Sequence, residues 1–364
     1  MLLLDKKEKT NIDSLTATRA FAALLVVAFH FAHVHTGISY IDRFFKNGNL
    51  AVSYFFVLSG YIMYLSYTDN YRSYKNFIQR RIARILPLYW IALIMSTMLV
   101  IYSIIIGLPP NYNLTYAFLS NATFTQVCID KYIFTLNTPG WSLCVEMSFY
   151  LLFPFLLQFQ KSRNKLFIWF TVIIYLASAI IHQLLADIFL KTGRLEAIGY
   201  YKPYLHFNQF LIGMLAAQLF NKSVKNYSFL PVISLSVILL FMCTDFGISA
   251  HDGLLAPVFA LFIGSIAASD PSFLKIRPLI FLGEISYGIY ILQRPVHNYF
   301  DLIYFKFSNN QTVGFIIYVF LLIAISALFY YIVEIPGKRW INNLGNKKVN
   351  TSELKLQPEV LSEV

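Results

Sequence analysis

The stretch Thr18-Arg-Ala-Phe-Ala-Ala-Leu-Leu-Val-Val-Ala-Phe-His30 is an apolar run with an ionisable residue near each end. Arg19 and His30 are eleven positions apart, so on an α-helix they lie on one face, about 16 Å apart along the axis. In a bilayer whose hydrocarbon core is about 30 Å thick, Arg19 would lie near one interface and His30 about halfway across. Because an ionisable side chain at that depth is costly, we interpret His30 as a candidate functional residue.

The rest of the composition also indicates a polytopic membrane protein. Of the 364 residues, 57% are hydrophobic and 13% are charged, whereas soluble domains have about 45–50% and 25%. Cys128, Cys144 and Cys243 lack metal-ligand spacing, so no metal is expected. We therefore predict an all-α integral membrane protein, a bundle of about ten transmembrane helices. The expected spans are 15–34, 49–68, 84–107, 140–160, 165–187, 204–220, 228–244, 252–269, 279–301 and 312–334.

The distribution of lysine and arginine predicts the orientation of these spans. With the N- and C-termini cytoplasmic, 21 of the 29 basic residues fall in cytoplasmic segments, as the positive-inside rule requires. This arrangement accounts for the net charge of +11 without a nucleic-acid partner. We expect residues 1–341 to form one domain in a bacterial inner membrane, in contact with membrane lipids. Residues 342–364 are expected to form a polar, disordered cytoplasmic tail.

A cluster of basic residues begins one of the expected spans. Arg80, Arg81 and Arg84 have i,i+3 and i,i+4 spacing, so they can present one guanidinium surface at the start of a helix, which Lys75 extends. Guanidinium groups suit phosphates, and this surface would then bind a cofactor or co-substrate. The alternative is an anchor that contacts anionic lipid head groups.

A single acidic residue, Glu146, lies inside the apolar span that begins near Trp141. Its carboxylate must be paired, protonated or directed into a wet cavity. It either orients a histidine such as His30 or pairs with a buried arginine, and the sequence leaves both interpretations open. We expect Trp141, Ser142 and Tyr150, from the same span, to contact substrate.

The stretch Leu282-Gly-Glu-Ile-Ser-Tyr-Gly-Ile-Tyr-Ile-Leu-Gln-Arg-Pro295 combines packing and polar features. Gly283 and Gly288 favour close approach of another helix. Pro295 can kink the span and free a backbone carbonyl group. Arg294 is a further candidate substrate contact, whereas Glu334, at the end of the last span, is interpreted as an ion-pair partner.

Several motifs together resemble the acyltransferase-3 family of bacterial integral-membrane O-acyltransferases, which modify glycans. They follow one another along almost the whole chain, so the match is specific although each motif is modest. The motifs are Arg19 with His30, Gly48 through Gly60, Arg80-Arg-Ile-Ala-Arg84 with Pro87 and Tyr89, Trp141 through Glu146 with Phe149, Tyr150 and Pro154, Phe207 to Gly213, Ile285 through Tyr290, and Glu334 with Pro336 and Arg339.

The resemblance implies a bundle of roughly ten spans, a cytoplasmic acyl-CoA co-substrate, usually acetyl-CoA, and a hydroxyl acceptor on a glycan or a lipid-linked oligosaccharide. It implies that Arg19 and His30 are the essential pair, with His30 as general base or acyl carrier, and that Arg81 and Arg84 are functional. Many members have His where this chain has Gln293, which leaves proton chemistry at that position open. Members with an appended SGNH-type hydrolase domain are longer, so we expect a stand-alone form.

Two other classes of protein compete with this expectation. A transporter or flippase of lipid-linked sugars also needs buried charges, but such proteins tend to contain internal repeats, which this sequence lacks. A sensor or scaffold has no need for Arg19 and His30 on one helix face. His33 and His35 are more external second choices for the working histidine.

Overall fold

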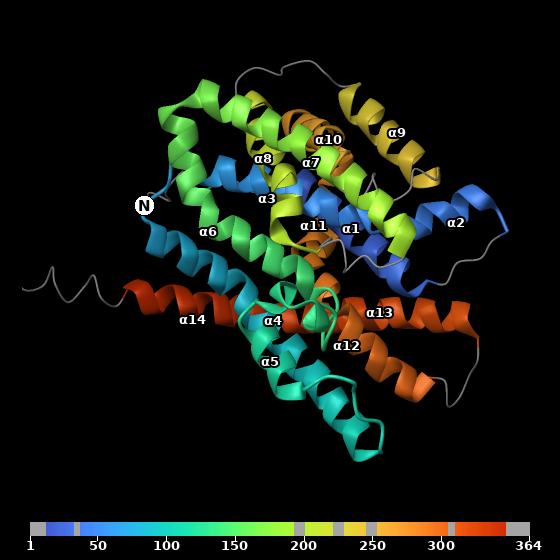
Figure 1. The fold of residues 1–364 in the computed structure, drawn as a ribbon. Coiled ribbons are helices and arrows are strands. Elements are labelled where there is room, and N and C mark those ends of the chain that lie inside the picture. Colours follow the sequence, from blue (N-terminus) through green and yellow to red (C-terminus); the bar gives the residue numbers. More distant parts are fainter. Residues whose placement is uncertain are drawn as a thin grey trace, which may run out of the picture.

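The computed structural model describes residues 12–32, 37–192, 201–220, 229–244, 253–304 and 310–346, and these residues form helices and connecting loops without a β-strand. The helices pack into one bundle (Figure 1). They are α1 (Asp13–Phe31), α2 (Ser39–Lys46), α3 (Leu50–Tyr67), α4 (Tyr74–Ile105), α5 (Leu114–Ala122), α6 (Gly140–Ser162), α7 (Asn164–Thr192), α8 (Pro203–Phe220), α9 (Leu230–Cys243), α10 (Ala256–Ser269), α11 (Arg277–Glu284), α12 (Ser286–Tyr304), α13 (Gln311–Phe329) and α14 (Ile335–Asn346).

The all-α prediction is confirmed for the described residues, and each of the ten expected spans contains at least one helix. Among the described residues, six helical stretches are long and apolar enough to cross a membrane; α9 and α10 are apolar but shorter. The count of ten spans and the cytoplasmic termini remain predictions. α14 runs to Asn346, beyond the expected domain end at residue 341, and most of the expected tail lies outside the described residues.

The outer surface of the bundle has the character of a membrane-facing surface. Along α7, large apolar side chains recur at helical spacing on the exposed face. Such a stripe would be unfavourable in water and is typical of contact with lipid. It consists of Leu166, Trp169, Ile173, Leu176 and Ile180.

Helix α1, which carries Arg19 and His30, lies inside the bundle and contacts α3, α10, α11 and α12. Its closest approach to α11 is at Gly283, where an added Cβ atom would lie 1.9 Å from the carbonyl oxygen of Thr16. This contact confirms the packing role predicted for Gly283 and fixes the position of the Arg19 end of α1.

The crossing of α3 and α8 is equally close. A Cβ atom added at Gly60 would lie 2.1 Å from the carbonyl oxygen of Phe210, and one added at Gly213 would lie 2.0 Å from that of Val57. Each glycine thus admits the backbone of the other helix, as small residues do in membrane bundles. The crossing places α3 beside α1, where its side chains line the cavities described below.

Three expected spans differ in detail from the structure. α4 begins at Tyr74, so the basic cluster lies within a long helix rather than at its start. The span expected at 279–301 is two helices, α11 and α12, which meet at Ile285. The last span continues through a π-helical turn, Tyr330–Glu334, into α14, so Glu334 lies inside a continuous helical stretch.

Candidate active site

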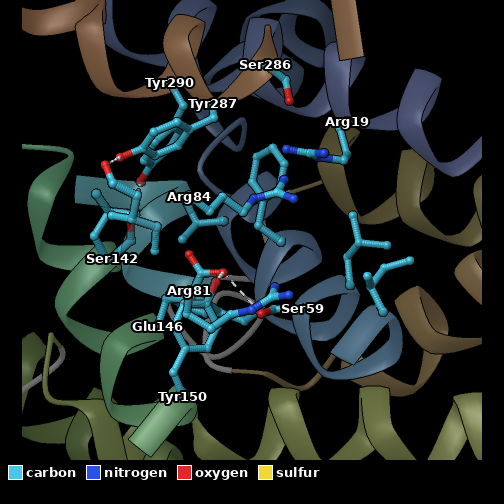
Figure 2. Close-up of a pocket in the computed structure, with 17 residues that line it drawn as sticks. Arg19, Ser59, Arg81, Arg84, Ser142, Glu146, Tyr150, Ser286, Tyr287 and Tyr290 are labelled. Carbon is cyan, nitrogen blue, oxygen red and sulfur yellow. Dashed lines mark hydrogen bonds between the residues drawn. The ribbon is translucent and has the colours of Figure 1, made fainter. Parts of the chain in front are cut away.

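A cavity of about 130 Å³ lies between α1, α3, α4, α6 and α12, and four of the charged residues selected from the sequence line it. Figure 2 shows these side chains directed toward one space. Three guanidinium groups and one carboxylate line the cavity, so it has an excess of positive charge. We call it the arginine cavity; the selected residues that line it are Arg19, Arg81, Arg84, Ser142, Glu146 and Tyr150.

Arg19 and Arg84 extend into the arginine cavity from α1 and α4 (Figure 2). The two like charges act on each other, and the carboxylates of Glu146 and Glu334 act on Arg19 with the opposite sign. Glu334, inside the π-helical turn, also acts on Arg84. Two guanidinium groups that face one space make a site suited to an anion.

Arg81 has a different environment from Arg84. It donates a hydrogen bond from Nη2 to the Tyr67 hydroxyl at 2.8 Å. Its guanidinium carbon also lies 5.2 Å from the ring centre of Tyr67 and 5.8 Å from those of Phe77 and Tyr150. These contacts hold Arg81 in place by hydrogen bonding and cation–π attraction.

Glu146 is held by two hydroxyl groups in the arginine cavity. Ser59 donates to Glu146 Oε1 at 3.1 Å, and the Tyr150 hydroxyl donates to the same oxygen. Its charge also acts on Arg19 and Arg81, two of the arginines that line the same cavity. Glu146 does not line the cavity that contains His30, so it is not placed to orient that ring.

His30 lines a second cavity, of about 330 Å³, which we call the histidine cavity. Its lining mixes aromatic rings with hydrogen-bonding side chains. Trp141, selected from the sequence, belongs to it and packs against Tyr201 and His206, with ring centres 5.0 Å and 5.5 Å away. The other polar residues that line it are Asn49, Ser53, Thr138 and Tyr290.

The two cavities share a wall. Val52 and Phe56 from α3 and Tyr290 from α12 line both. The Tyr290 hydroxyl is 2.6 Å from Ser142 Oγ, which fixes its ring between the cavities. Arg19 and His30 therefore line two adjacent cavities that share these three side chains.

Helix α12 is shaped by Pro295, as predicted. Proline has no N–H group, so the carbonyl oxygen of Ile291, one turn earlier, is not bonded within the helix. Asn137 donates to this oxygen from Nδ2 at 3.0 Å. The loop before α6 is thus bonded to the part of α12 that carries Tyr290 and Gln293.

Other residues selected from the sequence lie elsewhere. Arg80 and Lys75 do not line either cavity, although they lie on α4 before Arg81. Arg294 is exposed and lies over the Phe31 ring, 6.0 Å from its centre. The second-choice histidines, His33 and His35, lie outside the described residues.

Sequence reasoning missed several residues of this region. Tyr290, Ser59 and His206 line the cavities but were not selected. Tyr290 and Ser59 each lie in a motif already quoted, Ile285 through Tyr290 and Gly48 through Gly60, and this was the available signal. The side-chain partner of His30 is Gln293, whose Oε1 lies 3.0 Å from the imidazole Nδ1, across 263 positions of sequence. No periodicity within one helix predicts a pair so distant.

The fold and the site define a class: a helical membrane protein with a buried cationic cavity beside a histidine-containing cavity. The family model described as an acyltransferase domain, Acyl_transf_3, matches residues 12–331. The chain therefore belongs to the acyltransferase-3 family, as the sequence motifs predicted. This match does not favour a transporter.

Curated relatives support the same family. The O-acetyltransferase OatA of Staphylococcus aureus (strain NCTC 8325 / PS 47) is 26% identical over 361 residues, 90% of this chain and 57% of that protein. The putative peptidoglycan O-acetyltransferase YrhL of Bacillus subtilis (strain 168) is 26% identical over 322 residues, 78% of this chain and 48% of that protein. Acyltransferase MdmB of Streptomyces mycarofaciens is 34% identical over 161 residues, 40% of this chain and 38% of that protein.

The chain spans 57% of the length of OatA, so the match covers a part of that relative. No solved structure shows a significant match.

Proposed function

We propose that the protein transfers an acyl group, with acetyl as the first candidate, from acyl-CoA to a hydroxyl group of a cell-surface glycan or its lipid-linked precursor. The observation that carries the proposal is the pair of cavities on one face of α1, with Arg19 and Arg84 in one and His30 in the other. The family and the names of its relatives, O-acetyltransferase OatA and putative peptidoglycan O-acetyltransferase YrhL, support the same reaction.

The arginine cavity is the proposed donor site. Its excess of guanidinium groups suits the anionic phosphates of CoA. At about 130 Å³ it is smaller than the about 300–1,000 Å³ of typical small-molecule sites, so it would hold one part of the donor. Arg80 and Lys75, earlier on α4, would meet the remaining phosphates. The pantetheine arm would then extend past Val52, Phe56 and Tyr290 toward His30.

The histidine cavity is the proposed acceptor site. Trp141, Tyr201 and Tyr290 supply aromatic surfaces, and Asn49 and Ser53 supply hydrogen-bonding groups. A sugar ring has apolar faces and a rim of hydroxyl groups, so this combination suits it. Arg294, which lines neither cavity, would contact a part of the acceptor that lies outside.

The proposed reaction uses His30 as a general base. The acceptor hydroxyl oxygen attacks the thioester carbonyl carbon while the imidazole takes the hydroxyl proton. The carbon–sulfur bond breaks, the new ester remains on the glycan, and CoA leaves as the thiolate, which accepts a proton. Glu146 contributes by holding Tyr150 and by balancing the charge of Arg81.

The test uses the full chain in proteoliposomes with labelled acetyl-CoA and glycan oligosaccharides as acceptors. We expect CoA release together with an acetylated acceptor, and a rate lower by about 10²–10⁴-fold in His30→Gln, the range for removal of a general base. The matched control is His297→Gln, because His297 lies on α12 outside both cavities and hydrogen-bonds Asp301 at 3.0 Å.

Two results would overturn the proposal. One is wild-type acyl transfer by His30→Gln. The other is movement of lipid-linked sugar across the vesicle membrane without consumption of acetyl-CoA, which would indicate a transporter. Mass spectrometry of surface glycans from cells with and without the gene would then identify the acyl group and the acceptor, expected at the inner membrane of a bacterium.

A further inference from the structure

The imidazole of His30 meets a hydrogen-bond acceptor at one of its two nitrogens. Gln293 Oε1 lies 3.0 Å from Nδ1. The residue at the other end of this contact lies on α12, so the ring of a residue on α1 is held by a neighbouring helix.

The orientation of the Gln293 amide is decided by its other contact. Its Nε2 donates to the carbonyl oxygen of Tyr290 at 2.7 Å. In a flipped amide, Gln293 Oε1 would lie against the Tyr290 carbonyl oxygen, and the hydrogen bond between these two residues would be lost. The NH2 group would then point toward His30. Gln293 Oε1 therefore faces the imidazole.

Gln293 is itself held firmly. Its side chain is fully buried, with 0% exposure. The Tyr318 hydroxyl, from α13, donates to the backbone oxygen of Gln293 at 2.9 Å. One turn of α12 is further held by the Asn137 bond to Ile291. The oxygen that faces His30 is thus fixed from α12, α13 and the loop before α6.

Gln293 Oε1 cannot donate a hydrogen bond, so Nδ1 must carry the hydrogen atom. A neutral imidazole with hydrogen on Nδ1 keeps its lone pair on Nε2. A hydrogen-bond acceptor beside one ring nitrogen thus decides that the other nitrogen acts as the base. The carboxylate of a Ser-His-Asp site selects the tautomer in the same way.

We propose that Gln293 is a positioning residue that fixes His30 as the Nδ1–H tautomer and so makes Nε2 the proton acceptor. The proposal rests on the proposed function, in which His30 is the general base. A neutral amide fixes the tautomer without adding a negative charge beside the ring. The charged side chain that acts on His30 is Arg294, which follows Gln293 on α12. The other titratable side chains that line the histidine cavity are His206, Tyr201 and Tyr290.

The first test reads the tautomer directly and does not depend on activity. The full chain, labelled with ¹⁵N-histidine in detergent micelles, is compared with His30→Gln to assign the His30 signals. At a pH where the ring is neutral, we expect a protonated Nδ1 and an unprotonated Nε2. In Gln293→Leu, we expect the signals to move toward those of an exchanging mixture of both tautomers.

The second test reads the consequence for the reaction. For Gln293→Leu we expect kcat to fall on the order of 10–100-fold, the range for loss of a partner that orients a functional histidine. KM for acetyl-CoA should stay within about twofold, because the donor site lies beyond the shared wall. Gln218→Leu is the matched control, since Gln218 is a buried glutamine on α8 that donates to Asn164 and lines neither cavity.

The variant Gln293→Glu separates positioning from simple packing. Its carboxylate still accepts from Nδ1 but adds a negative charge, which stabilises the imidazolium form. We expect substantial activity with the acidic limb of the kcat/KM profile shifted to higher pH relative to the wild type.

Three results would overturn the proposal: protonated Nε2 with bare Nδ1 in the wild-type spectrum, unchanged kcat in Gln293→Leu, or an unshifted pH profile in Gln293→Glu. If the wild type transfers no acyl group while the spectrum shows the Nδ1–H tautomer, the proposed function fails and the tautomer assignment stands. The two failures are therefore distinguishable.

Discussion

Arg81 and Arg84 are one helical turn apart on α4, but their surroundings differ. Arg81 is enclosed by the rings of Tyr67, Phe77 and Tyr150 and hydrogen-bonds one of them. Arg84 instead faces the like charge of Arg19. We therefore propose that the first arginine contributes mainly to the stability of the fold and that the second binds an anionic ligand.

We predict that Arg84→Gln changes mainly the KM for acyl-CoA, whereas Arg81→Gln changes mainly the stability of the protein. Arg84→Gln should raise KM for acyl-CoA about tenfold, equal to about 1.4 kcal/mol. It should change thermal stability less than Arg81→Gln does, because the lost attraction to Glu334 is offset by the lost repulsion with Arg19. Arg81→Gln should lower the stability by about 2 kcal/mol or more through loss of its hydrogen bond and cation–π contacts. Steady-state kinetics and thermal unfolding in detergent measure both quantities. A destabilised Arg84→Gln and a stable Arg81→Gln would contradict this division.

At the scale of single elements, α12 depends on a residue outside it. Pro295 leaves the buried carbonyl oxygen of Ile291 without a donor in its own helix, and Asn137 supplies the donor. The cost of an unpaired buried carbonyl group is about 1–3 kcal/mol. Asn137 therefore links the loop before α6 to the part of α12 that lines both cavities.

A double-mutant cycle tests this link. We predict that Asn137→Ala lowers the free energy of unfolding by about 1–3 kcal/mol in the wild-type background. In the Pro295→Ala background the cost should be smaller, because the new N–H group at position 295 can donate to Ile291. Chemical denaturation in mixed micelles gives the four stabilities. Equal costs in both backgrounds would show that Asn137 acts through some other contact.

The crossing of α3 and α8 permits a second prediction at this scale. Gly60→Ala places a methyl group about 2.1 Å from the Phe210 carbonyl oxygen, so the helices must separate. We expect a loss of about 1–3 kcal/mol, the usual cost of overpacking, and lower acyl transfer because α3 carries Val52 and Phe56. Gly288→Ala is the comparison, since its nearest atom, Ser326 Cβ, is 3.2 Å away. A larger loss of stability in Gly288→Ala than in Gly60→Ala would contradict the prediction that the α3–α8 crossing is the tighter contact.

At the scale of the whole molecule, the two cavities lie at different depths of one bundle. The basic cluster of α4 leads to the arginine cavity, and the loop residues Phe134 and Thr138 contribute to the histidine cavity. With the predicted orientation, the first would be reached from the cytoplasm and the second from outside. The donor and the acceptor could then enter from opposite faces and meet at the shared wall.

Thiol labelling tests this two-sided arrangement. In a background where Cys128, Cys144 and Cys243 are replaced by Ser, the single substitutions Ser59→Cys and Ser53→Cys mark the arginine and histidine cavities. We predict that a membrane-impermeant reagent labels the first in inverted vesicles and the second in right-side-out vesicles. Labelling of both positions from one side would contradict the arrangement.

Sequence reasoning determined the helical membrane class and identified the face of α1 that carries Arg19 and His30. The positions of the helices follow from long apolar runs, because a chain in lipid must satisfy its backbone hydrogen bonds within each segment. The spacing of Arg19 and His30 follows from the helix repeat alone. Local chemistry was predictable as well, since the effect of Pro295 on α12 depends on its own ring.

The partners of these residues were decided by the tertiary structure. Glu146 was a candidate partner of His30, yet it lies with Ser59 and Tyr150, and Gln293 takes the place beside the imidazole. Arg81 and Arg84 were equivalent in the sequence and differ in the structure.

The physical reason is that contacts between helices depend on how far each helix is rotated and how deep it lies. Those two quantities are set where helices cross, as at Gly60 and Gly213, and where a loop side chain bonds a helix, as Asn137 bonds Ile291. The periodicity of a single helix identifies a face but not the residue opposite it. The sequence by itself therefore determined the helices and the face bearing Arg19 and His30, whereas the pairing of His30 with Gln293 arose only from packing in three dimensions.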